Sequence, residues 1–488
     1  MGMRGQWERY TAPKWAQATG PVGTVPRASP HVSMRANKRH RPLARTLGAL
    51  PQGVDLPRLA ERARYVGSPE HKDTPSFAGQ PKPRADATIC DRSFLDKLPQ
   101  LNSWLRSAFT VAEWLAIHWW SLFHEYENPR RVASGSYAMR HSLRYAREGF
   151  ALPDLDIRPL GRTVSLAWKV SDMPARGVHF LQEGIAHIET EVVYEALQQF
   201  ITAVVRRLEI MEVPNTPLED EWKAIKATEP EEQRFCEAVA ALGLDPYSLT
   251  DADRDAIVQV SEKLPTELVQ DFFAIADVQL LATQLSRLID GVNRIKSLPR
   301  DLTSLKNLQQ ATQKIDALYT PWEQGYACAR ELRRQLGIEE RLIRDMHDFS
   351  SCLQVDGQAL QDVILSANGT ARFFDALVDV NEKGSPGFLI ETRQEEAKKF
   401  AFCRGLFEYL TNQPGAPALI SATHSERQKR NRAFAAEFLV PAALLKERLQ
   451  RDTLDEEEAD DLAQVFGVSS YVIRHQIENH HLAHLILS

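Results

Sequence analysis

The sequence is poor in cysteine and in long apolar runs. Its 488 residues include five cysteines, which lie far apart, are odd in number and never form a CxxC pair. This spacing argues against a disulfide framework and against a cysteine-rich zinc module, so we expect reduced thiols in a cytoplasmic protein. No stretch approaches the roughly 18 apolar residues of a membrane helix, and the first residues lack the apolar core of a signal peptide. We therefore expect no membrane partner.

The chain also lacks a strong charge bias and the common catalytic motifs. A net charge of −6 and a pI near 6.2 give no global electrostatic reason to bind nucleic acid. Nucleophile elbows, phosphate-binding glycine loops, dinucleotide fingerprints and HExxH are all absent. The nearest string, HEYEN from His124, lacks the second histidine and runs into Pro129, which would break a helix.

Composition divides the chain into five segments. Residues 1–95 are rich in Pro, Gly, Ser and Thr and are basic up to residue 50, which predicts a largely disordered extension that is a candidate for touching DNA. Met34 offers an alternative start within it. Residues 96–215 combine an aromatic helix with strands such as TVSLAWKV (Thr163 to Val170), which predicts an α+β domain. Residues 216–320 have a helical pattern throughout, and residues 321–445 and 446–488 form the last two segments.

The stretch KKFAFCRGLFEYLTN, Lys398 to Asn412, predicts a helix with unusual residues in its apolar run. Arg404, Gly405 and Glu408 lie in the middle of it. Arginine is costly to bury, and glycine weakens a helix interior by about 1 kcal/mol. The short strand candidates ARFFDALVDV and GFLIET precede this helix.

The C-terminal segment 446–488 has the outline of a helix-turn-helix. In DLAQVFGVSSYVIRHQIENH, two helical stretches flank Gly467, and four polar residues would face DNA: Arg474, His475, Gln476 and Asn479. The acidic run LDEEEADD directly before it would repel phosphates, so the pattern favours a structural hairpin over a DNA reader. His480 and His484 are four residues apart, as two zinc ligands on one helix face would be.

Together these pieces resemble the ImmA/IrrE family of bacterial zinc metallopeptidases. The order of GFLIET, KKFAFCRGLFEYLTN, RAFAAEFLVP and LAQVFGVS follows the family, whose corresponding segments read like RFAFAHELGHLLLH, ANRFAAELLMP and LAxxFGVS. The resemblance covers roughly Pro321 to the C-terminus. It implies a mainly α, α+β fold, with a zincin-like C-terminal domain joined to a large helical N-terminal region.

The resemblance breaks at the residues that carry the chemistry. Aligned on KFAF, the family's HELGH falls on Arg404 to Glu408, so Arg404 and Glu408 replace the two zinc-binding histidines. Gly405 replaces the glutamate that takes a proton from the metal-bound water. The family's third, acidic ligand precedes FAAE, where this chain has Gln428, Lys429 and Arg430. We therefore expect no zinc cofactor, and an Arg404–Glu408 ion pair where the family holds zinc.

The resemblance favours a pseudo-peptidase that binds a protein partner in bacterial regulation, stress response, mobile-element control or phage defence. Cleft-lining candidates are Cys403, Glu437, Lys429 and Arg430, and Cys403 itself is a core residue rather than a nucleophile because no histidine is placed to activate it. One alternative is an active metallopeptidase that uses His424 with Glu426, or the C-terminal histidines. A further alternative is a DNA-binding regulator that acts through the basic arm or the terminal hairpin.

Overall fold

The computed structural model describes residues 103–131, 134–147, 152–170, 183–211, 216–298 and 320–486. Residues 367–371, 382, 393, 412–415 and 450 are gaps in the last range, and residues 213, 302, 305 and 308 are described singly. The expected disordered extension, 1–95, lies outside these residues. The chain separates into an N-terminal unit, residues 1–123 with 133–233, and a C-terminal unit, residues 124–132 with 234–488.

The N-terminal unit combines helices with a small antiparallel sheet. The strands are β1 (Asp154–Pro159), β2 (Thr163–Lys169) and β3 (Gly184–Glu189), paired in that order, and β2 confirms the strand predicted there. The helices are α2 (Ser103–Ile117), α3 (Trp119–His124), α4 (Ser134–His141), η3 (Leu143–Ala146), α5 (Thr190–Ile210) and α6 (Pro217–Ala227). Trp119 packs edge-on against Trp222 of α6, with ring centroids 5.1 Å apart. The dense aromatics of the predicted helix therefore form a core.

Helices dominate the C-terminal unit, which begins with the second half of α7 (Pro230–Ala241). Its helices before the sheet are α8 (Asp251–Lys263), α9 (Thr266–Ile275), η4 (Val278–Leu280), α10 (Leu281–Lys296), α12 (Pro321–Leu336), α13 (Met346–Leu353) and α14 (Gly357–Asp362). The later ones are α15 (Glu395–Thr411), α16 (Glu426–Leu439), α17 (Ala442–Arg448), α18 (Glu456–Phe466) and α19 (Ser470–His480). The predicted mainly helical character is thus confirmed for the described residues.

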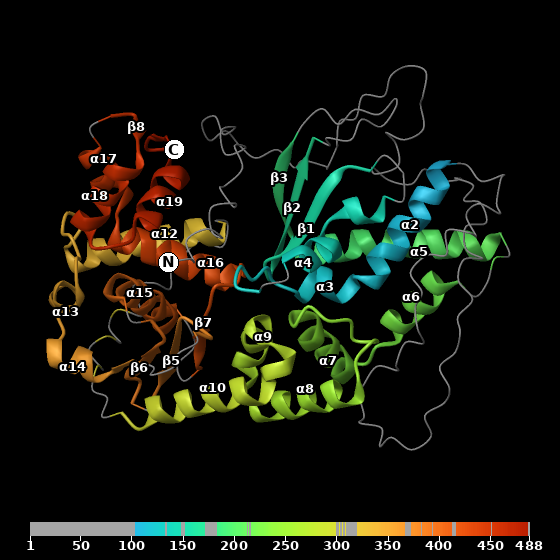
Figure 1. Ribbon diagram of the computed structural model, residues 1–488, viewed down its shortest axis with the longest axis horizontal. Helices are drawn as coiled ribbons and strands as arrows, with labels where there is room; N and C mark the ends of the chain where they lie inside the picture. The colour runs from blue at the N-terminus through green and yellow to red at the C-terminus, as the bar shows by residue number, and fades with distance from the viewer. Residues whose placement is uncertain are drawn as a thin grey trace, which may run out of the picture. The chain divides into compact units, whose positions relative to one another are not determined.

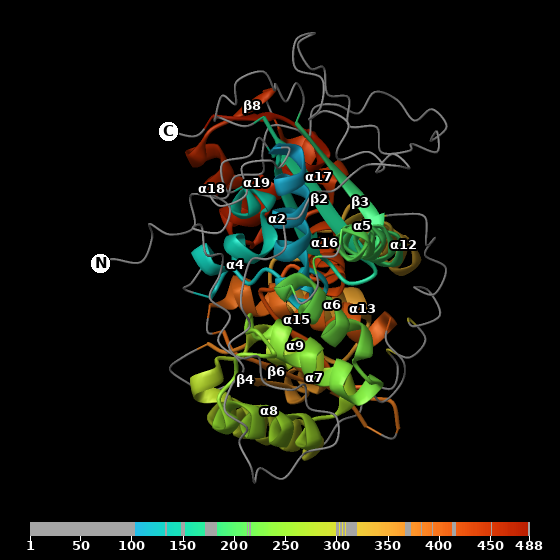
Figure 2. The same cartoon turned by 90° about the vertical axis from the view of Figure 1, so that its right-hand side faces the viewer.

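A four-stranded sheet lies at the centre of this unit, in the order β4–β6–β5–β7. Its strands are β4 (Ile364–Ser366), β5 (Ala376–Val380), β6 (Pro386–Ile390) and β7 (Ala418–Ile420). β6 pairs in parallel with β4 and antiparallel with β5, which in turn pairs antiparallel with β7. Figure 1 shows α15 above β5 and β6 and α10 below them, and the turned view of Figure 2 again places β4 and β6 between α15 and the lower helices.

Alternation along the strands explains the two covered faces. Val378 and Phe388 belong to the core on the α15 side, while Leu377 and Leu389 belong to the core that contains α10. Successive side chains of a strand point to opposite faces, so a sheet covered on both sides needs apolar residues at every position. β6 accordingly has five buried residues in a row.

A small two-stranded pairing closes the chain end, with β8 (Thr453–Leu454) parallel to β9 (His484–Leu485). Between these strands α18 ends at Gly467, whose φ of 62° is left-handed, and α19 follows. A Cβ at Gly467 would lie 2.3 Å from the Arg344 carbonyl oxygen, so only glycine fits this turn. The chain here forms two helices that flank Gly467.

Within the described residues, no single helix is long and apolar enough to cross a membrane. By length and composition alone, the segments Thr266–Ile275 and Val278–Lys296 would together be long and apolar enough, although the chain bends by 119° between them.

Candidate functional site

Helix α15 is buried on every side over most of its length, which accounts for its unusual composition. It begins with Glu395 and Glu396, whose charges suit a helix N-terminus. From Ala401 to Leu410 every residue is buried, and both Arg404 and Glu408 are at most 3% exposed. A helix without a solvent-facing stripe must satisfy its polar side chains internally.

Gly405 faces the sheet at close range. A Cβ at this position would lie 3.0 Å from Val378 Cγ2 and 3.1 Å from Phe388 Cδ1, tighter than ordinary van der Waals contact. The two strands therefore fill the space that a larger side chain would need. Glycine allows α15 to approach the sheet closely here, and a larger side chain would require Val378 or Phe388 to shift.

Arg404 donates four hydrogen bonds inside the unit. Its Nε donates to Asn431 Oδ1 at 2.7 Å, and its Nη1 donates to Asp375 Oδ2 at 2.6 Å. Its Nη2 donates to the Ser421 carbonyl and to Gln428 Oε1, each at 2.7 Å. The guanidinium thus finds the partners that a buried cation requires, with one carboxylate among them.

Asp375 accepts from three arginines. Arg404 occupies Oδ2, whereas Arg130 and Arg372 both donate to Oδ1, Arg372 at 2.6 Å. Burial alone would raise the pKa of Asp375, but the guanidiniums of Arg404, Arg130 and Arg372 outweigh it and hold that pKa well below its usual range. Asp375 is therefore ionised at neutral pH.

Sequence reasoning missed Asp375 and Arg130 as members of this site. Asp375 interrupts the apolar string ARFFDALVDV, and an acid within an otherwise buried strand segment was the available signal. Arg130 follows the Asn128-Pro129 break and reaches Asp375 across 245 positions of sequence. No local pattern encodes such a long-range pairing.

Helix α16 contacts the polar side chains of α15 through Gln428 and Asn431. The Ser425 side chain caps this helix by accepting from Gln428 N, which fixes the register of its first turn. Asn431 Nδ2 donates to Glu408 Oε1 at 2.8 Å, and Gln428 Nε2 donates to the Leu419 carbonyl at 2.8 Å. Of the three candidate positions for the third family ligand, Gln428 is therefore the one that reaches Arg404.

The predicted Arg404–Glu408 ion pair is wrong. Among the described residues, the carboxylate paired with Arg404 is Asp375, and the nearest cation to Glu408 is Arg427, whose Nε lies 3.8 Å from Oε2. Arg427 also donates to Asp271 and to the Leu419 carbonyl. An acid directly before β5 offers Arg404 a shorter, better aligned contact than the residue one turn along its own helix.

These side chains do not fit a zinc ion. At the positions of the family's ligands the chain has a guanidinium, a carboxylate already hydrogen-bonded to Asn431, and an amide. A guanidinium carries no lone pair for a metal and repels a cation. Among the described residues, no group of three or more His, Cys, Asp or Glu side chains could hold a metal ion.

The histidines named as alternative ligands are placed differently from the expectation. α19 ends at His480, because His481 has a left-handed φ of 51°, and His484 lies on β9. The two therefore do not share a helix face, and His480 Nε2 lies 3.3 Å from Glu437 Oε2. His424 Nδ1 lies 3.1 Å from Glu127 Oε2, and Glu426 is buried in the first turn of α16.

The four cleft-lining candidates occupy separate environments. Cys403 is fully buried in the core, and burial raises its thiol pKa well above the ordinary value, which disfavours the nucleophilic thiolate. Glu437 is also buried and accepts from Arg330 Nε at 2.8 Å. Lys429 Nζ lies 5.7 Å from the centre of the Trp322 ring. The Arg430 carbonyl lies where α16 touches Gly325 of α12, whose missing Cβ would be 2.3 Å away.

One of the four residues expected to face DNA is held inside the C-terminal unit. Gln476 is fully buried and donates to Glu437 Oε2 and to the Val440 carbonyl. Asn479 is exposed, and its Nδ2 donates to the Tyr326 hydroxyl at 3.1 Å. The assignment is therefore wrong for Gln476 and stays a prediction for Arg474, His475 and Asn479.

The match to a known family coincides with these elements. Residues 392–478 match the family model described as IrrE N-terminal-like domain, Peptidase M78. This part of the chain is IrrE-like. The match begins just before α15 and ends within α19, so it contains Arg404, Gly405, Glu408 and Gln428, and it confirms the resemblance to ImmA/IrrE proteins over this range. No curated protein and no solved structure matches the chain.

Proposed function

We propose that the IrrE-like domain is a zincin-like fold that has lost peptidase chemistry and serves as a binding or sensing module in bacterial regulation. The observation that carries the proposal is the hydrogen-bonded Arg404 guanidinium at the first ligand position. It donates to Asp375 and Gln428, so the residues around it are arranged to hold a fixed cation rather than a metal ion.

The closed space at Gly405 supports the same proposal. A hydrolytic zinc site needs a base beside the metal-bound water, and Val378 and Phe388 occupy the volume that such a side chain would enter. The missing zinc ligands and the missing general base therefore support the same conclusion, the loss of peptidase chemistry. The domain would act on its partner by binding, for example by adding a segment of a regulatory protein to a sheet edge.

Glu408 offers a direct test, because it is the one carboxylate at a motif position. Glu408→Gln keeps an oxygen that accepts from Asn431 Nδ2 but removes the charge that metal chemistry would need. In the native host, we expect the regulatory phenotype of the deletion strain to be restored equally by the wild-type gene and by the Glu408→Gln gene. Restoration by the wild type alone, with the variant protein folded and present in equal amount, would contradict the proposal.

An active peptidase with other ligands would behave differently. If His480 or His424 bound a catalytic metal, His480→Ala or His424→Ala would abolish activity while Glu408→Gln would not. We expect neither histidine variant to change the metal content of the protein, since the partners of His480 and His424 are Glu437 and Glu127.

A DNA-binding role, the other alternative, requires duplex binding that weakens steeply with salt.

A further inference from the structure

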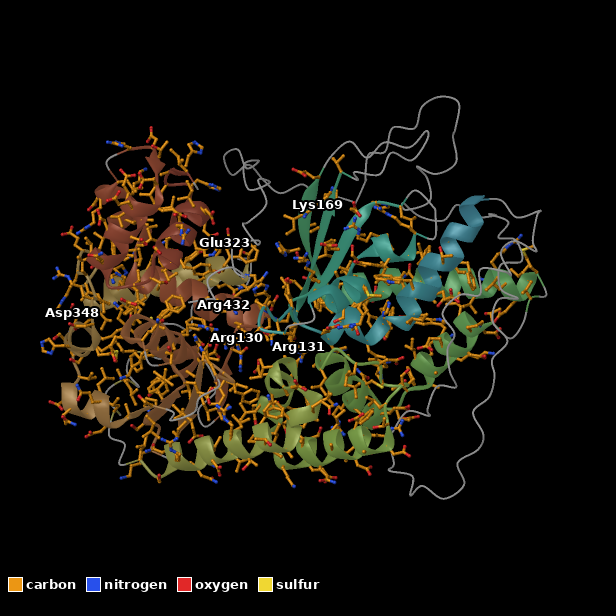
Figure 3. The ribbon with its side chains drawn as sticks, in the orientation of Figure 1. Arg130, Arg131, Lys169, Glu323, Asp348 and Arg432 are labelled. Carbon is orange, nitrogen blue, oxygen red and sulfur yellow. The ribbon has the colours of Figure 1, made fainter. Side chains whose placement is uncertain are left out.

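Four arginines of the C-terminal unit converge on two acceptor groups, a carboxylate and a backbone carbonyl. Arg404, Arg130 and Arg372 donate to the Asp375 carboxylate. Arg404 and Arg432 donate to the Ser421 carbonyl, at 2.7 and 3.3 Å. Because they share acceptors, the guanidiniums are neighbours in space, and Figure 3 shows Arg130 and Arg432 close together near α16. We call these four arginines with Asp375 the arginine cluster.

The arginine cluster has more positive charge than it has carboxylate. Three guanidiniums pair with one carboxylate and the fourth, Arg432, shares the Ser421 carbonyl with Arg404, which leaves an excess of three positive charges within the cluster. Arg432 has no carboxylate partner among the described residues, and its bonds go to the carbonyls of Ser421 and Thr423. Burial and the nearby Arg404 lower the pKa of Arg432 to about 9, so it still carries its charge at neutral pH.

Three of the arginines also have access to solvent. The side chains of Arg130 and Arg372 are 28% and 39% exposed, and Arg432 is half-buried, whereas Arg404 lies beneath at 4%. Nη1 of Arg130 is buried and has no hydrogen-bond partner among the described residues. A buried, unsatisfied guanidinium nitrogen is unfavourable unless a ligand or water accepts its hydrogen bond.

From this geometry we infer that the arginine cluster binds the phosphoryl group of a small molecule. A phosphoryl group carries up to two negative charges and three acceptor oxygens, which suits several forked guanidiniums at once. A single carboxylate would bring only one charge, and the cluster already contains one in Asp375. Cations gathered at one point suit a single phosphoryl group. A nucleic-acid backbone instead requires cations spread along a line of phosphates.

This inference goes beyond the proposed function, since it assigns a ligand and does not depend on whether the domain has lost its peptidase activity.

Titration calorimetry of the full-length protein with pyrophosphate, at a fixed ionic strength of about 0.15 M, tests the inference. We expect saturable binding in the sub-millimolar range. The variant Arg130→Gln/Arg372→Gln should bind at least about tenfold more weakly, because it removes two charge-assisted donors yet leaves Asp375 paired with Arg404. The matched control is Arg474→Gln, since Arg474 is similarly exposed at 34% and pairs with Glu456.

Two measurements keep the result interpretable. Thermal melting of each unliganded variant should show a folded protein, and the single variant Arg372→Gln should already weaken binding if the double variant is unstable. Absence of saturable pyrophosphate binding to the wild type, or equal weakening by Arg474→Gln, would overturn the inference. So would tight binding of a 20-base-pair duplex, about two helical turns, by a protein that does not bind pyrophosphate.

Discussion

Arg404 on helix α15 and Asp375 before strand β5 form an ion pair of 2.6 Å in the interior of the C-terminal unit. Both side chains are at most 5% exposed. The pair joins helix α15 to the segment that leads into β5. In the function proposed above this fixed charge replaces a metal ion, and several of the following predictions depend on the pair.

Removal of the guanidinium should destabilise the protein strongly. Arg404→Met removes the donor to Asp375 Oδ2 and to Asn431 Oδ1 and one of the donors to Gln428 Oε1, and breaking a buried pair costs about 3–5 kcal/mol. Arg404→Lys should cost less, because the ammonium keeps the charge but not the fork. Urea unfolding of the variants, with Arg474→Gln as the exposed control, measures the difference. A loss below about 1 kcal/mol, the value typical of a surface pair, would show that the network carries little stability.

A larger residue at position 405 should lower the stability of the protein, unlike the same change elsewhere in a helix. Glycine to alanine in a helix interior normally gains up to about 1 kcal/mol. At position 405 the new Cβ presses on Val378 and Phe388, so we expect Gly405→Ala to lose that gain. Gly405→Glu adds a buried carboxylate among apolar side chains and should cost more than about 3 kcal/mol. Gly357, the first residue of α14, is the control for thermal unfolding, because a Cβ there would meet only Ser350 Oγ at 3.5 Å, an ordinary van der Waals contact.

The sequence could predict the elements but not the partners of this site. The apolar pattern of KKFAFCRGLFEYLTN predicts a helix and the string ARFFDALVDV predicts a strand, and both form. The family resemblance likewise identified positions 404, 405 and 408. Pairing with Asp375 and Arg130 depends on contacts between residues far apart in the chain, which no local spacing encodes. Local spacing suggested Glu408 for Arg404 and a shared helix face for His480 and His484, and tertiary packing and a left-handed residue overruled both.

Stability should depend on the ionisation of Asp375 in acid. The pKa of Asp375 is lowered by its arginines, so its contribution is complete above the unfolded-state value of about 4 and is lost as pH falls below that value. Asp375→Asn lacks this contribution at every pH. The difference in unfolding free energy between wild type and variant should therefore be largest at neutral pH and shrink in acid. A difference that stays constant between pH 7 and about 3 would contradict the assignment.

Lys399 should give a pH dependence of the same sign, but in an alkaline window. Its Nζ donates to the carbonyls of Ile343, Arg344 and Phe466, and burial lowers its pKa to about 8. The unfolded chain keeps this proton up to about pH 10.4, so between pH 8 and that value the unfolded state binds more protons and stability rises with pH. Relative to Lys399→Met, the wild type should gain about 1–2 kcal/mol between pH 7.5 and 9.5. Chemical denaturation of both proteins at the two pH values measures this gain, and parallel curves would contradict it.

Restoring the family's residues should not restore the family's chemistry. Arg404→His with Gly405→Glu still leaves Gln428 at the third position and places the glutamate against Phe388. We expect this double variant to unfold at a lower temperature than the wild type and to cleave no peptide library. Cleavage that a chelator abolishes would contradict this prediction and would show that Val378 and Phe388 can move to accommodate the glutamate.

The central claim is that Arg404 and its acceptors hold a fixed charge where relatives hold zinc. Metal analysis of the full-length protein tests it most directly, after incubation with excess zinc and dialysis against metal-free buffer. The account predicts far less than one zinc per chain, with the same residual amount in wild type and in Glu408→Gln. Close to one zinc per chain in the wild type, reduced in Glu408→Gln, would contradict it.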